Sequence, residues 1–171
     1  MNAFNNIQIR KAKLSEAPTV SALLHDSFLE YQSFYTQKAF EASTPGVIEV
    51  EDRIADNTVW VVLLEGKIAG TVSALVISKS LFIRSMAVAA FARRAGVAKF
   101  LMKKMEKIAL ENDCNKLELS CTPFLIPALK LYESLGFRIS GYESPHGTEL
   151  VRMTKPLSIL NPKSFQHDYA K

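Results

Sequence analysis

A glycine at position 96 stands between a strand-like segment and a helix-like segment, with basic residues around it. The apolar run 81–88 predicts a strand, and an amphipathic helix is predicted to open near Val97. Backbone N–H groups in the first turn of a helix lack intrahelical partners, and with the helix dipole they attract anions such as phosphate. Gly96 lets a bulky oxyanion approach the backbone, so the segment predicts a binding site for a phosphorylated ligand.

Three cations, Arg93, Arg94 and Lys99, add positive charge beside this turn. The segment lacks both the GxxxxGK[ST] pattern of a P-loop and the GxGxxG pattern of a dinucleotide-binding turn. The residues alone are equally consistent with an ordinary helix start that carries a solvated basic face. The two cysteines, Cys114 and Cys121, lack CxxC spacing and the histidines are scattered, so neither a metal site nor a disulfide scaffold is expected.

The elements that must position this turn alternate between strands and helices along the chain. Strands are predicted at 7–13, 58–64, 68–77, 81–88, 117–121, 137–142 and 149–155. Helices are predicted at 16–30, 97–111 and 127–135, and a further helix is expected to begin at Pro45, with Thr44 as its cap. Hairpins mix with β-α-β crossovers in this order, which predicts one mixed sheet with helices on its faces, an α/β (α+β) fold.

The chain has 171 residues, of which 48% are hydrophobic and 22% charged, a globular composition that excludes global disorder. We expect a single domain over 1–157 and a polar tail over 158–171. The net charge of +4 is a mild basic excess, which fits an anionic ligand, a nucleic acid or no particular partner. No membrane span or signal peptide is visible, so a cytoplasmic protein is expected.

Two stretches resemble signature motifs of the GNAT superfamily of N-acetyltransferases. Residues 93–98, RRAGVA, fit the acyl-CoA motif of that family, Arg/Gln-x-x-Gly-x-Gly/Ala, at every defined position. Residues 128–137, ALKLYESLGF, resemble its second motif, Ala-x-x-Leu-Tyr-x-x-x-Gly-Phe. The motifs occur in the order and at the spacing of the family, and the resemblance extends over about 7–157.

The resemblance implies a GNAT-like fold, in which helices flank both faces of a mixed, mostly antiparallel sheet, and acetyl-CoA as co-substrate without a metal. The strand 81–88 would bind the pantetheine and polarise the thioester carbonyl, and the amides of 94–99 would hold the pyrophosphate. The residues implied in cofactor binding are Met86, Ala87, Val88, Arg93, Arg94, Ala95, Gly96, Val97, Ala98 and Lys99.

The same resemblance places Tyr132 beside the thioester sulfur as the catalytic residue that protonates the departing thiolate. A phenol with a pKa of about 10 is matched well enough to a thiol with a pKa of about 8.5. The alternative is a core tyrosine with a satisfied hydroxyl, because tyrosines on apolar helix faces mostly pack in cores.

Two positions depart from the family pattern. Leu125 stands where the family often has an asparagine that contacts the cofactor, which puts one pantetheine contact in doubt. Phe82 stands near the place where some members carry a carboxylate base, and the polar residues of that strand are Arg84 and Ser85 instead.

The group that deprotonates the amine is left open by the sequence. A lysine-like amine, with a pKa of about 10.4, must lose a proton before it attacks. Glu118, Glu30, Tyr31 and a water chain are candidate bases, and Glu118 is equally consistent with an exposed strand residue. Cys121 is expected to be a small core residue, since the family pattern transfers acetyl directly.

The sequence thus predicts an acyltransferase that moves acetyl from acetyl-CoA to a primary amine of a small molecule or peptide, by direct attack in a ternary complex. The alternative is a non-catalytic CoA-binding regulatory module of the same fold, which the missing acid at Phe82 favours. A nucleic-acid binder lacks support, because aromatic-basic interleaving and helix-turn-helix spacing are absent. We expect neither a nucleic-acid nor a membrane partner, and a homodimer is left open.

The acceptor site is expected in the region 28–56, which combines aromatic and acidic residues. Carboxylates suit a cationic amine and aromatic rings suit its carbon frame, although a solvated helical hairpin would have the same composition. Polyamines, aminoglycoside-like amines, amino acids and peptide N-termini all remain open. The residues concerned are Phe28, Glu30, Tyr31, Phe34, Tyr35, Glu41, Glu49, Glu51 and Asp52.

Overall fold

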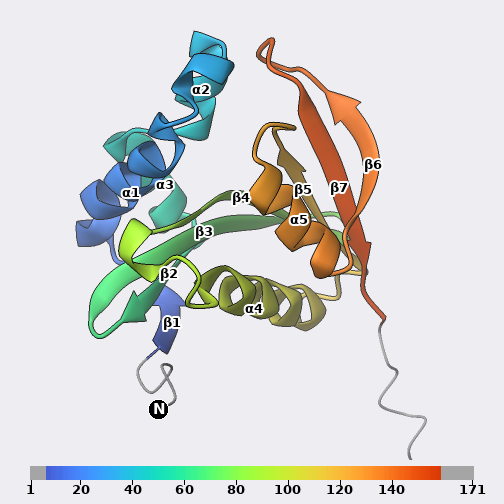
Figure 1. The fold of residues 1–171 in the computed structure, drawn as a ribbon. Helices are drawn as coiled ribbons and strands as arrows, with labels where there is room; N and C mark the ends of the chain where they lie inside the picture. The colour runs from blue at the N-terminus through green and yellow to red at the C-terminus, as the bar shows by residue number, and fades with distance from the viewer. Residues whose placement is uncertain (1–6, 159–171) are drawn as a thin grey trace, which may run out of the picture.

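The computed structural model describes residues 7–158, which form a seven-stranded sheet with helices on both faces (Figure 1). The strands lie in the order β1-β2-β3-β4-β5-β7-β6, and all neighbours are antiparallel except β4 and β5. This confirms the predicted mixed, mostly antiparallel sheet. The strands are β1 (Ile7–Lys11), β2 (Val59–Leu64), β3 (Lys67–Ile77), β4 (Ser80–Val88), β5 (Lys116–Cys121), β6 (Arg138–Glu143) and β7 (Leu150–Pro156).

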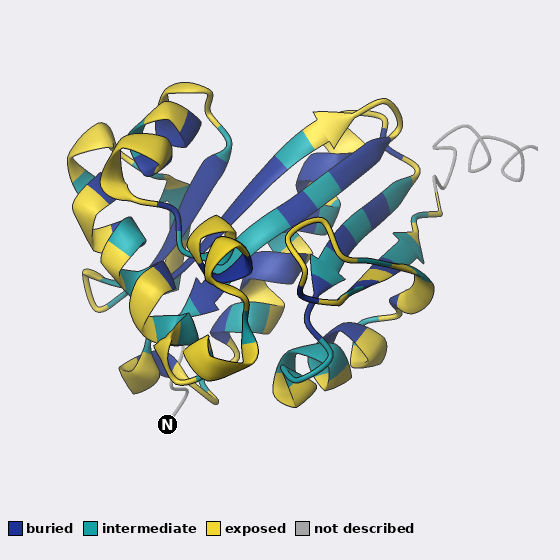
Figure 2. Ribbon diagram, turned by 90° about the horizontal axis from the view of Figure 1, so that it is seen from above, coloured by how far each residue is buried: buried dark blue, intermediate teal, exposed yellow. Residues whose placement is uncertain are grey.

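The helices pack against the sheet in two layers, as the residues of β2 illustrate. Val61 and Val62 are neighbours on β2 and therefore point to opposite faces. Val61 packs with Leu24 of the first layer of helices, and Val62 belongs to the cluster that contains Leu101 of the second. Figure 2 shows the buried residues concentrated along the central strands between the layers. The helices are α1 (Ala17–Leu29), α2 (Gln37–Ser43), α3 (Val47–Ala55), α4 (Val97–Glu111) and α5 (Ile126–Ser134).

The parallel pair β4 and β5 opens along its length. The two strands pair only from Ser80 opposite Lys116 to Ile83 opposite Leu119, and both continue beyond that point. On its other side β4 has a bulge, because Ser85 and Met86 together face a single residue of β3. A bulge bends its strand and re-aims side chains, so it accompanies the separation of β4 from β5.

Helix α4 lies close to the sheet because β3 has a glycine beneath it. A Cβ atom at Gly70 would lie 2.9 Å from Cγ1 of Val97 and 3.2 Å from the carbonyl oxygen of Ala87. Gly70 therefore fixes the distance between the sheet and the first turn of α4, where the predicted phosphate site lies.

Substitution of Gly70 by valine is expected to lower the free energy of unfolding by about 1–3 kcal/mol, since it overpacks the contact with Val97 and Ala87. Urea denaturation measures the loss. Gly141→Val is the matched control, because a Cβ at Gly141 on β6 would meet nothing within 4 Å. Equal stabilities of the two variants would show that the close approach at Gly70 is unimportant.

The segment 31–46 differs from the sequence-based prediction. It contains α2, which was not predicted, and the Thr36 side chain caps this helix by accepting a hydrogen bond from the Ala39 amide. Thr44 and Pro45 do not begin α3: Thr44 bonds back to the carbonyl of Phe40, and α3 starts after Gly46. A seven-residue helix is too short to show a hydrophobic period, which explains why α2 was not predicted.

The predicted tail lies mostly outside the described residues, which end at 158. Between residues 7 and 158, no helix has both the length and the apolar composition needed to cross a membrane.

Candidate active site

The first turn of α4 and the loop before it form the predicted anion site. Arg94 and Gly96 both adopt positive φ angles, 65° and 77°, which turn the chain sharply from β4 into the helix. A cavity of about 360 Å³ lies against this turn. Its lining is Val88, Ala92, Arg93, Arg94, Gly96, Val97, Ala98, Lys99 and Leu131. Seven of the ten residues predicted to bind the cofactor therefore line one cavity.

The other three predicted cofactor residues lie apart from that cavity. Met86 lines a second cavity further back along β4. Ala87 is buried in the core beneath α1 and α3, and Ala95 packs against the core on the α4 side. The structure thus places Met86 and Val88, two residues apart on one strand, in the walls of two neighbouring cavities.

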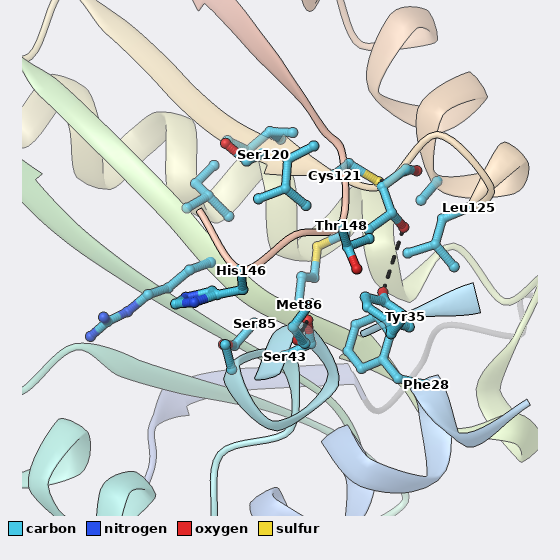
Figure 3. A pocket seen from close by; sticks show the side chains of 18 of the residues that line it. Phe28, Tyr35, Ser43, Ser85, Met86, Ser120, Cys121, Leu125, His146 and Thr148 are labelled. Atoms are coloured by element: carbon cyan, nitrogen blue, oxygen red, sulfur yellow. Dashed lines mark hydrogen bonds between the residues drawn. The ribbon is translucent and has the colours of Figure 1, made fainter. Parts of the chain in front are cut away.

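The second cavity, of about 350 Å³, occupies the opening between β4 and β5. Side chains from both strands, from α5 and from the α1–α3 region converge on it (Figure 3). Among them are Phe82 and Leu125, the two departures from the family pattern.

Tyr132 of α5 lies in the wall of this second cavity. It is 7% exposed, and its ring packs 5.8 Å from that of Phe137. Burial raises the pKa of the Tyr132 phenol well above its ordinary value, and the neighbouring Cys121 raises it further. The hydroxyl therefore stays protonated through the neutral and mildly alkaline range, as a proton donor to a thiolate must.

Cys121 lines the same cavity but is not suited to act as a nucleophile. Burial raises the pKa of its thiol to about 12, so the thiolate is scarce at neutral pH. This agrees with the expectation that Cys121 is a small buried residue.

Two arginines give the second cavity its charge. The Arg53 side chain, from α3, is only 10% exposed; it donates to Ser85 Oγ at 2.8 Å and pairs with Glu49. Arg84 comes from β4, and its Nε is buried with no hydrogen-bond partner among the described residues. Burial lowers the pKa of Arg84, and the charge of Arg53 lowers it further.

The bulge in β4 turns Ser85 to the side of Arg84 and Arg53. Successive residues of a regular strand point to opposite faces, but Arg84 and Ser85 both line the cavity, and Ser85 touches Arg53. The non-glycine positive φ at Ser85, 52°, marks this change of direction.

The residues of 28–56 that were considered for the acceptor site contribute unequally to this cavity. Phe28 and Tyr35 do line the cavity, but none of the predicted carboxylates does; its charged lining residues, within the described chain, are Arg53 and Arg84, with the imidazole of His146 at the rim. Glu49 is turned to Arg53 instead. The sequence contains a signal for an arginine in the cavity wall. Arg53 follows Val50 by three residues and therefore lies on the same, buried face of α3.

The residue that caps α2, Thr36, bonds to the β6–β7 turn, and the two segments face each other in Figure 1. Thr148 and His146 of that turn line the cavity (Figure 3). The Thr36 amide donates to Thr148 Oγ1 at 2.9 Å, and the Thr36 hydroxyl donates to the carbonyl of His146 at 2.5 Å. Below it, the Tyr35 hydroxyl lies 3.5 Å from Thr122 Oγ1. His146 and Tyr35 are thereby held in the cavity wall.

The carboxylates considered as general bases lie elsewhere. Glu118 bonds to Ser80 and Lys116, which hold the pKa of its carboxyl below the usual range, and it does not line the cavity. Glu30 lies 3.7 Å from Arg93, and Tyr31 stacks on Phe124. Over residues 7–158, no group of three or more His, Cys, Asp or Glu side chains is arranged to hold a metal ion.

Comparison with solved structures finds proteins of the same fold. The PaiA N-acetyltransferase from Thermoplasma acidophilum, solved in complex with coenzyme A, has a TM-score of 0.75 at 15% identity, over 89% of this chain and 99% of that one. An acetyltransferase of the GNAT family from Streptococcus agalactiae has the same TM-score and identity, over 91% and 98%.

Sequence comparison finds relatives and a family. N-acetylaspartate synthetase of Xenopus tropicalis is 38% identical over 89 residues, and the Homo sapiens protein of that name is 34% identical over 84. The matches cover 51% and 48% of this chain but 33% and 28% of those proteins, so the chain spans about a third of the length of these curated relatives. The model of the acetyltransferase (GNAT) family matches residues 20–137, well over half of the chain. The chain therefore belongs to the GNAT family of acetyltransferases.

Proposed function

We propose that the protein transfers an acetyl group from acetyl-CoA to the primary amine of a small amino acid. The observation that carries this proposal is the path along β4 from the α4 turn to Tyr132. Three cations line the cavity at Gly96, as a pyrophosphate site would require. Val88 lines this cavity, and Met86, two residues away on β4, lines the cavity that also contains Tyr132. A neighbour of the same fold has been solved with coenzyme A.

The residues of the chain have separate tasks in this proposal. When bound, acetyl-CoA supplies the acetyl group as a thioester. Amides of the α4 turn hold its phosphates, and the edge of β4 beyond Ile83, which β5 leaves unpaired, holds the pantetheine. The acceptor amine attacks the carbonyl carbon, the C–S bond breaks, and Tyr132 donates its hydroxyl proton towards the leaving sulfur. The amine loses one proton, so the products are an amide and a free thiol.

Aspartate is the first acceptor to test. The relatives of known name are N-acetylaspartate synthetases, and the cavity beside Tyr132 has arginines rather than the carboxylates that a polyamine would require. The volume of about 350 Å³ also suits a small molecule.

The proposal is tested by measuring free thiol released from acetyl-CoA with a panel of amino acids, polyamines and short peptides. We expect turnover with acidic amino acids. A protein that binds acetyl-CoA but releases no thiol with any of these amines would be a regulatory module of this fold.

The basic residues of the α4 turn are expected to make cofactor affinity depend on salt. Arg93, Arg94 and Lys99 line the cavity, and exposed charges are screened strongly above about 0.1 M salt. Calorimetric titrations at several salt concentrations should therefore show a steep loss of CoA affinity and a shallow one for pantetheine, which lacks the nucleotide. Equal slopes for the two ligands would remove these cations from the site.

A further inference from the structure

Two guanidinium groups lie together in the wall of the cavity between β4 and β5, and the structure gives them unequal surroundings. Arg53 is satisfied on both sides, by Glu49 and by Ser85. Arg84 forms no ion pair within residues 7–158, and its Nε is buried without a hydrogen-bond partner there. Glu49 pairs with Arg53, and although Glu49 and Asp56 lie near enough to raise the pKa of Arg84, neither forms an ion pair with it among the described residues.

This arrangement destabilises the folded protein unless an anion binds to it. A buried polar group without a partner loses the hydrogen bonds that water would give it, and two like charges repel each other in a medium of low dielectric constant. Arg84 keeps its charge nevertheless, because guanidinium is protonated at any physiological pH. A planar guanidinium is the side chain best suited to bind a carboxylate through two parallel hydrogen bonds.

We propose that Arg84 binds the side-chain carboxylate of the acceptor and thereby selects an acidic amino acid over its neutral analogues. Arg53 acts as a positioning residue: the bonds to Glu49 and Ser85 fix it beside Arg84 and engage Glu49, which therefore forms no ion pair with Arg84. This inference rests on the proposed function, since it names the group that recognises the substrate of that reaction.

The position of Arg84 on β4 also explains how recognition is linked to transfer. Arg84 precedes Met86 by two residues on the strand, and both line the cavity that Tyr132 of α5 also lines. An acceptor whose carboxylate is held at Arg84 therefore has its amine within the same cavity of about 350 Å³ as the tyrosine. The carboxylate and the thioester would lie at opposite ends of the acceptor.

The first experiment uses the unmodified protein and compares aspartate with asparagine, which differ in charge but hardly in shape. We expect kcat/KM for aspartate to exceed that for asparagine by roughly 100-fold, because asparagine leaves the half-buried guanidinium of Arg84 without a carboxylate partner. Equal kcat/KM values would overturn the inference while leaving the proposed function intact. Absence of thiol release with every amine would instead refute the proposed function.

The second experiment assigns the selectivity to Arg84. In Arg84→Gln we expect KM for aspartate to rise strongly and the preference over asparagine to fall to within a few-fold of unity, with the Kd of acetyl-CoA unchanged. Arg84→Lys keeps the positive charge but lacks the planar group that binds a carboxylate through two hydrogen bonds. It should therefore show part of the preference for aspartate that Arg84→Gln loses. Arg138→Gln is the matched control, because Arg138 is exposed on β6 and bonds only to main-chain carbonyls.

Two results would contradict the assignment to Arg84. An Arg84→Gln protein that keeps the preference for aspartate would show that another group binds the carboxylate. A parallel loss of acetyl-CoA affinity would place Arg84 in the donor site. If Arg84→Gln fails to fold, the comparison of substrates by the folded Arg84→Lys protein decides the question.

Discussion

Replacing Tyr132 by phenylalanine is expected to lower kcat by roughly ten- to a thousandfold, around or below the usual range for acid catalysis. The variant removes one hydroxyl and keeps the ring that packs on Phe137. The Kd of acetyl-CoA should hardly change, because the hydroxyl matters most when charge develops on the sulfur. If Tyr132 served only in packing, the substitution would cost about 1 kcal/mol of stability and leave turnover unaffected.

Steady-state kinetics with a good acceptor measure kcat, and calorimetry measures the Kd of acetyl-CoA. Tyr142→Phe is the matched control, since Tyr142 is 65% exposed on β6 and lines neither cavity. A Tyr132→Phe enzyme with the kcat of the unmodified protein would leave the thiolate to be protonated by water.

The pH dependence of kcat should carry no alkaline limb from Tyr132. The group is an acid that must be protonated to act, and burial raises the pKa of this phenol, so the active form persists above the ordinary value for tyrosine. An alkaline limb near pH 10 that vanishes in Tyr132→Phe would contradict the burial of the hydroxyl.

Enlarging Ala98 to leucine is expected to weaken acetyl-CoA binding by roughly ten- to a hundredfold, by displacing the phosphates from two or more amide hydrogen bonds. Ala98 is half-buried in the first turn of α4 and lines the cavity there. Leucine is a good helix former, so the helix itself should be undisturbed.

The substitution at Ala98 is preferable to one at Gly96. Gly96→Val should also weaken binding by more than about tenfold, but φ of 77° at this position would strain valine by about 1–3 kcal/mol. Calorimetry of both variants should show the loss, with Ala22→Leu on the exposed side of α1 as control. Unchanged affinity in a folded Ala98→Leu protein would move the phosphate site elsewhere.

The sheet and the long helices were predictable from the sequence because their hydrophobic periods are long. Helix α4 spans fifteen residues with one buried face, and its predicted bounds agree with the structure. The predicted β3 and β4 begin within one residue of the observed strands. Periodicity over such lengths reports burial directly, whereas α2, with seven residues, makes only two turns and leaves no comparable pattern.

The two halves of the candidate site were predictable to different degrees. The turn at Gly96 is a local motif, and the cavity there contains most of its predicted residues. The charge of the second cavity is not local: Arg53 comes from α3 and Arg84 from β4. The bulge turns Ser85 to Arg53, and nothing in the sequence marks this serine for a positive φ. The acidic residues of 49–52 suggested a cationic acceptor, but Glu49 pairs with an arginine of the cavity instead.

The central claim is that this chain moves acetyl from acetyl-CoA to a small amine, and isotope-labelled acetyl-CoA tests it most directly. The protein is incubated with aspartate and acetyl-CoA labelled in the acetyl group, and the products are identified by mass spectrometry beside free-thiol determination. We expect labelled N-acetylaspartate and free thiol in equal amounts, with the rate reduced in Tyr132→Phe. Tight binding of acetyl-CoA without any labelled amide above the protein-free background, with aspartate or any other amine, would contradict the claim.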